Sequence, residues 1–167
     1  MLQLRLLTAG LALLALPLAA CVTSNGGGTG GTGGSTGSDP SLCSTDPRAE
    51  AYAIGLSAKS MDGKIEVSFV DASPAPPTKG ENAWTVEVTD GTGKPVTGAT
   101  ISLEPYMPDH GHGSSITPQI KPMPSTPGQY QVTLIDLFMP GIWQNTFTIM
   151  PPSGTAESVV FTFCVDG

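Results

Sequence analysis

Residues 84–104 read Trp-Thr-Val-Glu-Val-Thr-Asp-Gly-Thr-Gly-Lys-Pro-Val-Thr-Gly-Ala-Thr-Ile-Ser-Leu-Glu, and this stretch decides the class of fold. Apolar and polar residues alternate over Trp84–Thr89 and again over Ala99–Glu104, which is the pattern of half-buried β-strands. The glycines of Asp90–Gly93, between these segments, are typical of a turn. The stretch therefore predicts two strands separated by a turn.

The same alternation recurs on both sides of this stretch. It predicts further strands at Ile65–Phe69, Tyr130–Leu134, Trp143–Ile149 and Val159–Val165, and Ala51–Ala58 is compatible with one more. About seven short strands with Gly- and Pro-rich turns, in a domain of roughly 125 residues, favour an all-β fold, an immunoglobulin-like antiparallel β-sandwich. A closed β-barrel is the alternative.

The segment Glu104–Pro127 departs from this rhythm because it contains six prolines. Proline has no N–H to donate to a sheet, so we expect mostly loop or edge strand here. Long loops in compact domains are often functional. This one also holds both histidines of the chain.

The first twenty residues predict an export signal. Arg5 precedes the apolar run Leu6–Leu18. This run is shorter than a typical transmembrane helix, and polar residues follow it abruptly. The run ends in Leu-Ala-Ala-Cys21, which resembles the lipobox of bacterial lipoproteins and implies that Cys21 is lipidated after cleavage. An ordinary signal peptide with a chance cysteine is the alternative.

The Gly/Ser/Thr-rich residues that follow have almost nothing to bury and predict a flexible linker. The chain thus divides into a lipoprotein signal peptide (residues 1–20), a lipidated cysteine with its linker (residues 21–42) and one β-sandwich domain (residues 43–167). The lipobox implies a protein of the bacterial cell envelope, anchored to a membrane at Cys21. Val22, in place of aspartate, favours the outer membrane, facing the periplasm or the cell surface.

Cys43 and Cys164 bracket the domain. An even pair of cysteines in an exported domain predicts a disulfide, which would close a loop of about 120 residues. Cys164 lies in the predicted strand Val159–Val165, on the face opposite Phe161 and Phe163, so the bridge would join the N-terminal segment to the last strand. Two metal-binding thiols are the alternative.

The charges exclude two kinds of binding. The chain has 7 Lys and Arg against 14 Asp and Glu, a net charge of −7, and its basic residues are scattered singly. Binding to nucleic acid, and binding to a membrane surface through basic side chains, both require a basic cluster. We therefore expect no nucleic-acid partner. The expected attachment to a membrane is through the lipid at Cys21, and the expected protein partner is an unidentified protein of the envelope.

The sequence also argues against an enzyme. It has no Gly-x-Ser-x-Gly nucleophile motif, no His-Glu-x-x-His zinc motif and no phosphate-binding glycine loop between a strand and a helix. We expect a binding domain without catalytic residues.

One short loop, Met107–Gly113, concentrates side chains that can bind a metal; it reads Met-Pro-Asp-His-Gly-His-Gly. In an extended segment the side chains of His110 and His112 point to the same side, where both imidazoles can bind one ion. Met107 precedes them and is followed by proline, and a second Met-Pro pair begins at Met139, in Met139-Pro-Gly141. Because thioethers favour Cu(I) and imidazole suits copper, zinc and nickel, these four residues predict copper rather than zinc.

Two other interpretations stay open. The carboxylate of Asp109 could take part instead, with a harder ion. Alternatively, the histidines belong to a plain glycine-rich turn and the methionines fill the core, as methionines usually do. The domain would then be a structural or protein-interaction module that binds no metal.

Four segments together resemble the YtkA-like domain, which is related to FixH-like proteins: residues 84–99, 107–113, 128–132 and 139–143. The resemblance covers roughly residues 64–150. It implies an immunoglobulin-like envelope domain without an established enzymatic activity, in a neighbourhood linked to copper handling and oxidase assembly. The sequence shows no membrane helix of the FixH type, so we do not expect a direct role in oxidase assembly.

Overall fold

The computed structural model describes residues 42–167, and nine β-strands form the framework of this region. The strands are β1 (Ser57–Lys59), β2 (Ile65–Ser73), β3 (Gly80–Asp90), β4 (Thr100–Met107), β5 (His112–Gly113), β6 (Gln119–Pro122), β7 (Gln129–Leu137), β8 (Gly141–Met150) and β9 (Glu157–Val165). A short 3₁₀-helix, η1 (Leu42–Thr45), precedes them. No helix in the described region is long and apolar enough to cross a membrane. The predicted signal peptide, Cys21 and almost all of the linker lie outside the described residues.

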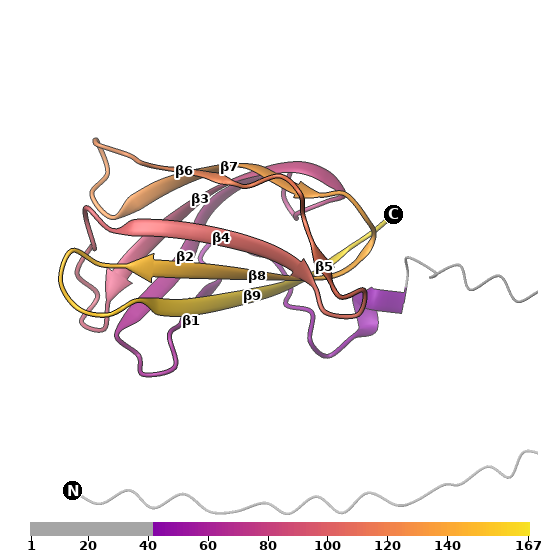
Figure 1. The fold of residues 1–167 in the computed structure, drawn as a ribbon, viewed down its shortest axis with the longest axis horizontal. Helices are drawn as coiled ribbons and strands as arrows, with labels where there is room; N and C mark the ends of the chain where they lie inside the picture. The colour runs from indigo at the N-terminus through magenta and orange to yellow at the C-terminus, as the bar shows by residue number, and fades with distance from the viewer. Residues whose placement is uncertain (1–41) are drawn as a thin grey trace, which may run out of the picture. The chain divides into compact units, whose positions relative to one another are not determined.

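The strands form two antiparallel sheets that pack face to face (Figure 1). One sheet has the order β1-β2-β3-β7-β6, and the other has the order β5-β4-β8-β9. This arrangement confirms the predicted immunoglobulin-like antiparallel β-sandwich. Within residues 42–167 no strand is shared by the two sheets, so the alternative of a closed barrel is wrong.

Nine strands replace the seven that were expected. Six predicted strands correspond to β2, β3, β4, β7, β8 and β9. Most of these strands extend beyond the alternating residues, but β4 begins at Thr100, one residue after the predicted start at Ala99. Ala51–Ala58 is strand only from Ser57 onward, because a turn precedes it in which the Leu56 N–H donates to the Ala53 carbonyl over 3.0 Å. The other two additions, β5 and β6, are short edge strands of the proline-rich segment, as expected for that composition.

Strand β4 passes through Pro105 and ends at Met107, beyond the predicted end at Glu104. The Pro105 carbonyl faces the β5 side, where it accepts a hydrogen bond from the Ser114 N–H over 3.2 Å. The proline nitrogen faces the same side, just beyond the last β4–β5 pair, so the ladder between β4 and β8 loses no donor. This extension brings Met107 to the end of the strand.

Aromatic side chains fill the space between the two sheets. Trp84, Val86 and Val88 alternate with more exposed residues on β3, and all three are buried. Phe69 meets Trp84 and Phe161 edge to face, with ring centres 5.3 Å and 4.9 Å apart. Such pairs contribute about 0.5–1.5 kcal/mol beyond the burial of their surface. The alternation seen in the sequence therefore encodes one core shared by both sheets.

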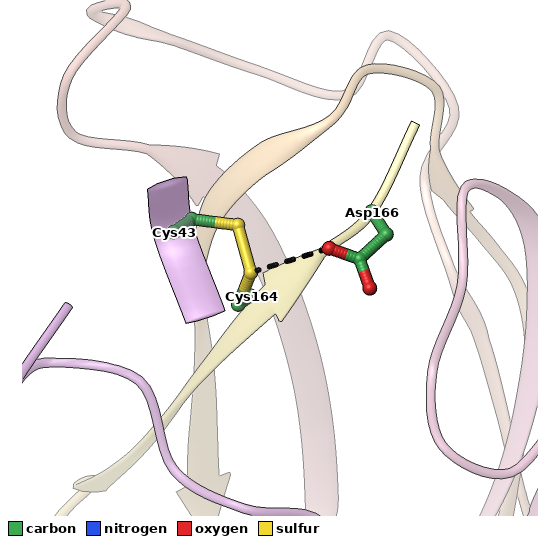
Figure 2. Close-up of side chains that lie close together, drawn as sticks. All are labelled: Cys43, Cys164 and Asp166. Atoms are coloured by element: carbon green, nitrogen blue, oxygen red, sulfur yellow. Dashed lines mark hydrogen bonds between the residues drawn. A yellow bond between two sulfur atoms is a disulfide. The ribbon is translucent and has the colours of Figure 1, made fainter. Parts of the chain in front are cut away.

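A disulfide between Cys43 and Cys164 ties the N-terminal segment to β9 (Figure 2). The predicted pairing is confirmed, and the alternative of two metal-binding thiols is wrong because the sulfurs are bonded to each other. Cys164 lies on the outer face of β9, and its cross-strand partner on β8, Ile142, is only 3% exposed. The bridge thus lies beside an apolar side chain that is buried outside the main core.

Candidate metal centre

The hairpin between β4 and β5 places both histidines at one end of the sandwich. Met107 and His112 are cross-strand partners, and the Met107 carbonyl accepts hydrogen bonds from the N–H groups of His110 (3.2 Å) and Gly111 (2.9 Å). Gly111 has a φ of 73°, a left-handed conformation that glycine adopts without steric cost. The expectation of one extended segment through both histidines is therefore wrong, because the chain turns at Gly111.

The turn nevertheless brings the two imidazoles together. The ring centres of His110 and His112 are 5.7 Å apart, and the ring planes meet at 49°. A ring bound through one nitrogen at about 2.0 Å has its centre about 3.2 Å from the ion, so two rings on one ion can be up to about 6.4 Å apart. The observed separation lies within that limit. His110 is exposed and His112 half-buried, which leaves the pair open to an ion from solvent.

An aromatic stack supports the inner histidine. His112 stacks on Phe138, with ring centres 5.6 Å apart and planes 24° apart. Phe138 in turn meets the edge of Trp143 at 5.6 Å. The Trp143 indole is fully buried, and its N–H donates to the Met139 carbonyl over 2.8 Å. The core thus fixes the loop that carries Phe138, and that loop positions His112.

The two methionines pack in or against the core. Met107 is 1% exposed, and as the cross-strand partner of His112 it projects from the same face of the hairpin. Its methyl group packs against Gly141, where an added Cβ would lie 2.8 Å from the methionine Cε. Met139 is partly buried and packs against the core. The structure therefore brings the two histidines together at the surface, and it buries Met107, the cross-strand partner of His112, in the core.

Asp109, the hard-ion alternative, is engaged by an arginine. Arg48 donates from Nη1 and Nη2 to the two carboxylate oxygens of Asp109, both over 2.8 Å. The same guanidinium contacts Asp46 through Nε (3.0 Å) and Nη2 (2.6 Å). Hydrogen bonds from Arg48 lower the pKa of Asp109, and they lower the pKa of Asp46 to about 2. Both oxygens of Asp109 thus already accept hydrogen bonds from one guanidinium.

A second group of potential ligands surrounds the disulfide. The sulfurs of Cys43 and Cys164 and a carboxylate oxygen of Asp166 lie within 4.8 Å of one another. Figure 2 shows the carboxylate of Asp166 pointing toward the disulfide. A thiolate binds metals, and a disulfide sulfur is not a thiolate, so this group is not a metal site. In the described part of the chain no other three His, Cys, Asp or Glu side chains converge in this way. The histidine pair would therefore be completed by sulfur or by water.

A model of the YtkA-like family matches residues 59–148, which is more than half of the chain. The chain belongs to the YtkA-like family. The matched region contains the histidine hairpin and the segment from Met139 to Trp143, so the resemblance seen in these motifs is confirmed. No curated protein matches the chain significantly.

Three solved structures are similar to this YtkA-like domain at a low level. One is a DUF4426 family protein from Pseudomonas aeruginosa PAO1, with a TM-score of 0.49, 14% identity, and coverage of 65% of this chain and 96% of the other. Two are of FetP from uropathogenic Escherichia coli strain F11. The copper-bound variant has a TM-score of 0.47, 16% identity, and coverage of 70% and 92%. The as-isolated protein has a TM-score of 0.46, 17% identity, and coverage of 70% and 96%. Similarity at this level does not extend to a ligand.

Two residues near the histidines of this YtkA-like domain were not singled out by the sequence. Phe138 directly precedes the Met139-Pro-Gly element, and that position was the only signal available for it. Arg48 lies 61 residues before Asp109, and no local sequence pattern predicts their contact. Both residues act through tertiary packing.

Proposed function

We propose that this YtkA-like domain is a lipid-anchored binding domain of the bacterial cell envelope that handles metal by binding copper. The proposed ligands are the imidazoles of His110 and His112, with thioether sulfur from Met107 and Met139. The 5.7 Å separation of the two imidazole centres at the tip of a hairpin carries the proposal. The domain acts as a carrier, buffer or sensor and is not an enzyme.

The chemistry of the available donors supports copper over harder ions. Imidazole nitrogen and thioether sulfur are borderline and soft ligands, and sulfur in particular favours Cu(I). The nearest carboxylate, that of Asp109, is held by Arg48 through both of its oxygens. Phe138, backed by Trp143, stacks on His112 and gives that imidazole an apolar neighbour.

We expect the His110→Ala/His112→Ala variant to bind Cu(I) at least about 100-fold more weakly than the wild type, since it loses both nitrogen ligands; this corresponds to about 2.8 kcal/mol. Competition with a chromophoric Cu(I) chelator measures the affinity, in a buffer with a reducing agent that keeps copper as Cu(I). Gln119→Ala, on the neighbouring edge strand β6, serves as the matched control and should bind like the wild type. Wild-type binding weaker than micromolar, or equal binding by the double variant, would contradict the proposal.

The two methionines are tested separately from the histidines. Met107→Leu and Met139→Leu preserve side-chain volume and remove only sulfur, so packing is largely kept. A drop in Cu(I) affinity with retained thermal stability identifies the sulfur as a ligand. If both variants bind Cu(I) like the wild type, the site consists of the two histidines with solvent, and the methionines serve the core.

A second candidate function is a protein-interaction module that binds no metal. The observation that favours it is the 38% exposure of Phe138, a large aromatic side chain stacked on His112 at the surface. Copper titration separates the two candidates directly. Under this second function, Phe138→Ser would weaken capture of an envelope partner while copper has no effect on it.

The membrane anchor is proposed from the lipobox and has its own test. The wild-type protein, expressed with its leader in a bacterium, should be recovered in the membrane pellet. Cys21→Ala should move it to the soluble fraction, because the lipid is attached through that sulfur. Recovery of Cys21→Ala in the membrane pellet after a high-salt wash would show that another segment provides the attachment.

A further inference from the structure

We infer that Arg48 determines the metal specificity of the histidine site, by withholding the carboxylate of Asp109 from an ion bound to His110 and His112. This inference rests on the proposed copper site and adds a residue that selects against zinc and other harder ions. Arg48 is a positioning residue here, because it acts through Asp109 and does not touch the ion.

The contact between Arg48 and Asp109 has the geometry of a strong, specific pair. Two N–H groups of one planar guanidinium meet the two oxygens of one carboxylate, each over 2.8 Å. Two-point contacts of this kind fix orientation as well as charge. The side chains are 46% and 50% exposed, so the net stabilisation of the fold is small. A specific geometry with little effect on stability suits a function in the site.

The arginine is itself held from the opposite side. Asp46 accepts hydrogen bonds from Nε and Nη2 of Arg48, and also from its backbone N–H over 2.9 Å. The N–H of Asp46 donates to the Cys43 carbonyl, and Cys43 is joined to β9 by the disulfide. The contact between Arg48 and Asp109 places the segment that follows η1 against the turn between β4 and β5. The covalent bridge thus keeps Arg48 next to the histidine turn.

Release of Asp109 would change the set of donors. Asp109 directly precedes His110 in the turn, so a carboxylate released by Arg48 can rotate toward the His110 imidazole. Two histidines with one carboxylate form a donor set that Zn²⁺ and other divalent ions bind well. With the carboxylate occupied, the remaining donors are nitrogen and sulfur, which favour Cu(I). The ion pair between Arg48 and Asp109 therefore decides whether the histidine site offers soft donors or includes a hard carboxylate.

The test compares Zn²⁺ and Cu(I) affinities of the full-length mature protein and three variants. Arg48→Met keeps much of the arginine length and removes the guanidinium; we expect its Zn²⁺ affinity to rise at least tenfold while its Cu(I) affinity changes less than threefold. Arg48→Lys keeps the charge without the two-point contact and should gain less Zn²⁺ affinity. Arg48→Met/Asp109→Asn should lose the gain. Thermal unfolding confirms that each variant is folded.

A direct readout separates ligation from the loss of a nearby positive charge. In Arg48→Met, Zn²⁺ should shift the ¹³C resonance of the Asp109 carboxyl carbon, because the oxygens become ligands. A rise in Zn²⁺ affinity without that shift would be a field effect and would overturn the inference, as would an unchanged Zn²⁺ affinity.

The proposed function fails on a different result. It fails if the wild type does not bind Cu(I), whatever Arg48→Met does with zinc. If the wild type binds Cu(I) through the histidines and Arg48→Met gains no zinc, the copper site stands and only the function of Arg48 is wrong.

Discussion

Replacement of both bridging cysteines, Cys43→Ser/Cys164→Ser, is expected to lower the free energy of unfolding by about 4 kcal/mol. The disulfide spans 121 positions of sequence. Closing a loop of that length lowers the conformational entropy of the unfolded chain, which stabilises the folded state by nearly 5 kcal/mol. Loss of the bridge also loosens the N-terminal segment near Ile142, whose side chain is 3% exposed. Both effects act in the same direction.

Urea unfolding monitored by tryptophan fluorescence measures this change. Wild-type protein treated with a reductant should approach the stability of the serine variant, which controls for the substitutions themselves. The single variant Cys43→Ser should be equally destabilised, because one cysteine cannot form the bridge. A loss below about 1 kcal/mol would show that the unfolded chain is already compact, so that the bridge restricts little.

Trp143→Ala is expected to destabilise the domain by a similar amount, about 4 kcal/mol. The indole is fully buried between the sheets, and large aromatic-to-alanine changes in cores cost about 3–5 kcal/mol. The substitution also removes the N–H that donates to the Met139 carbonyl and the ring that supports Phe138. We therefore expect weaker Cu(I) binding as well as lower stability.

Trp143→Phe is the matched control for this prediction. It keeps an aromatic ring in the core and loses the N–H, so about 1–2 kcal/mol should be lost, close to the value of one buried hydrogen bond and a small cavity. Chemical unfolding followed by far-UV circular dichroism reports both variants. If Trp143→Ala lost stability but bound Cu(I) like the wild type, the aromatic stack would not position His112.

The fold was largely predictable because each long strand has one buried face. In Trp84–Thr89 every second residue points into the core, so burial leaves a period of two in the sequence. The disulfide was predictable for a similar reason, since alternation placed Cys164 outside, opposite Phe161 and Phe163. Edge strands were expected in the proline-rich segment, but the bounds of β5 and β6 were not predictable, because these strands have too few residues to show a period.

The site was predictable only in part. Two histidines separated by one glycine stay close in any local conformation. The prediction that the imidazoles lie close together therefore holds, although the predicted extended geometry was wrong. The burial of Met107 follows from the extension of β4 past Pro105, and proline ordinarily ends a strand. Arg48 and Phe138 reach the site through contacts between distant segments, which leave no local pattern.

The position of the disulfide also determines how the domain responds to mechanical force. Cys43 precedes all nine strands, and Cys164 is the last residue but one of β9, which ends at Val165. Tension applied along the chain on either side of this bridge runs from Cys43 through the two sulfurs to Cys164. The hydrogen-bonded ladders between these positions carry none of it. The sandwich, with its histidine hairpin, can therefore be pulled from both ends without being unfolded, as long as the bridge stays oxidised.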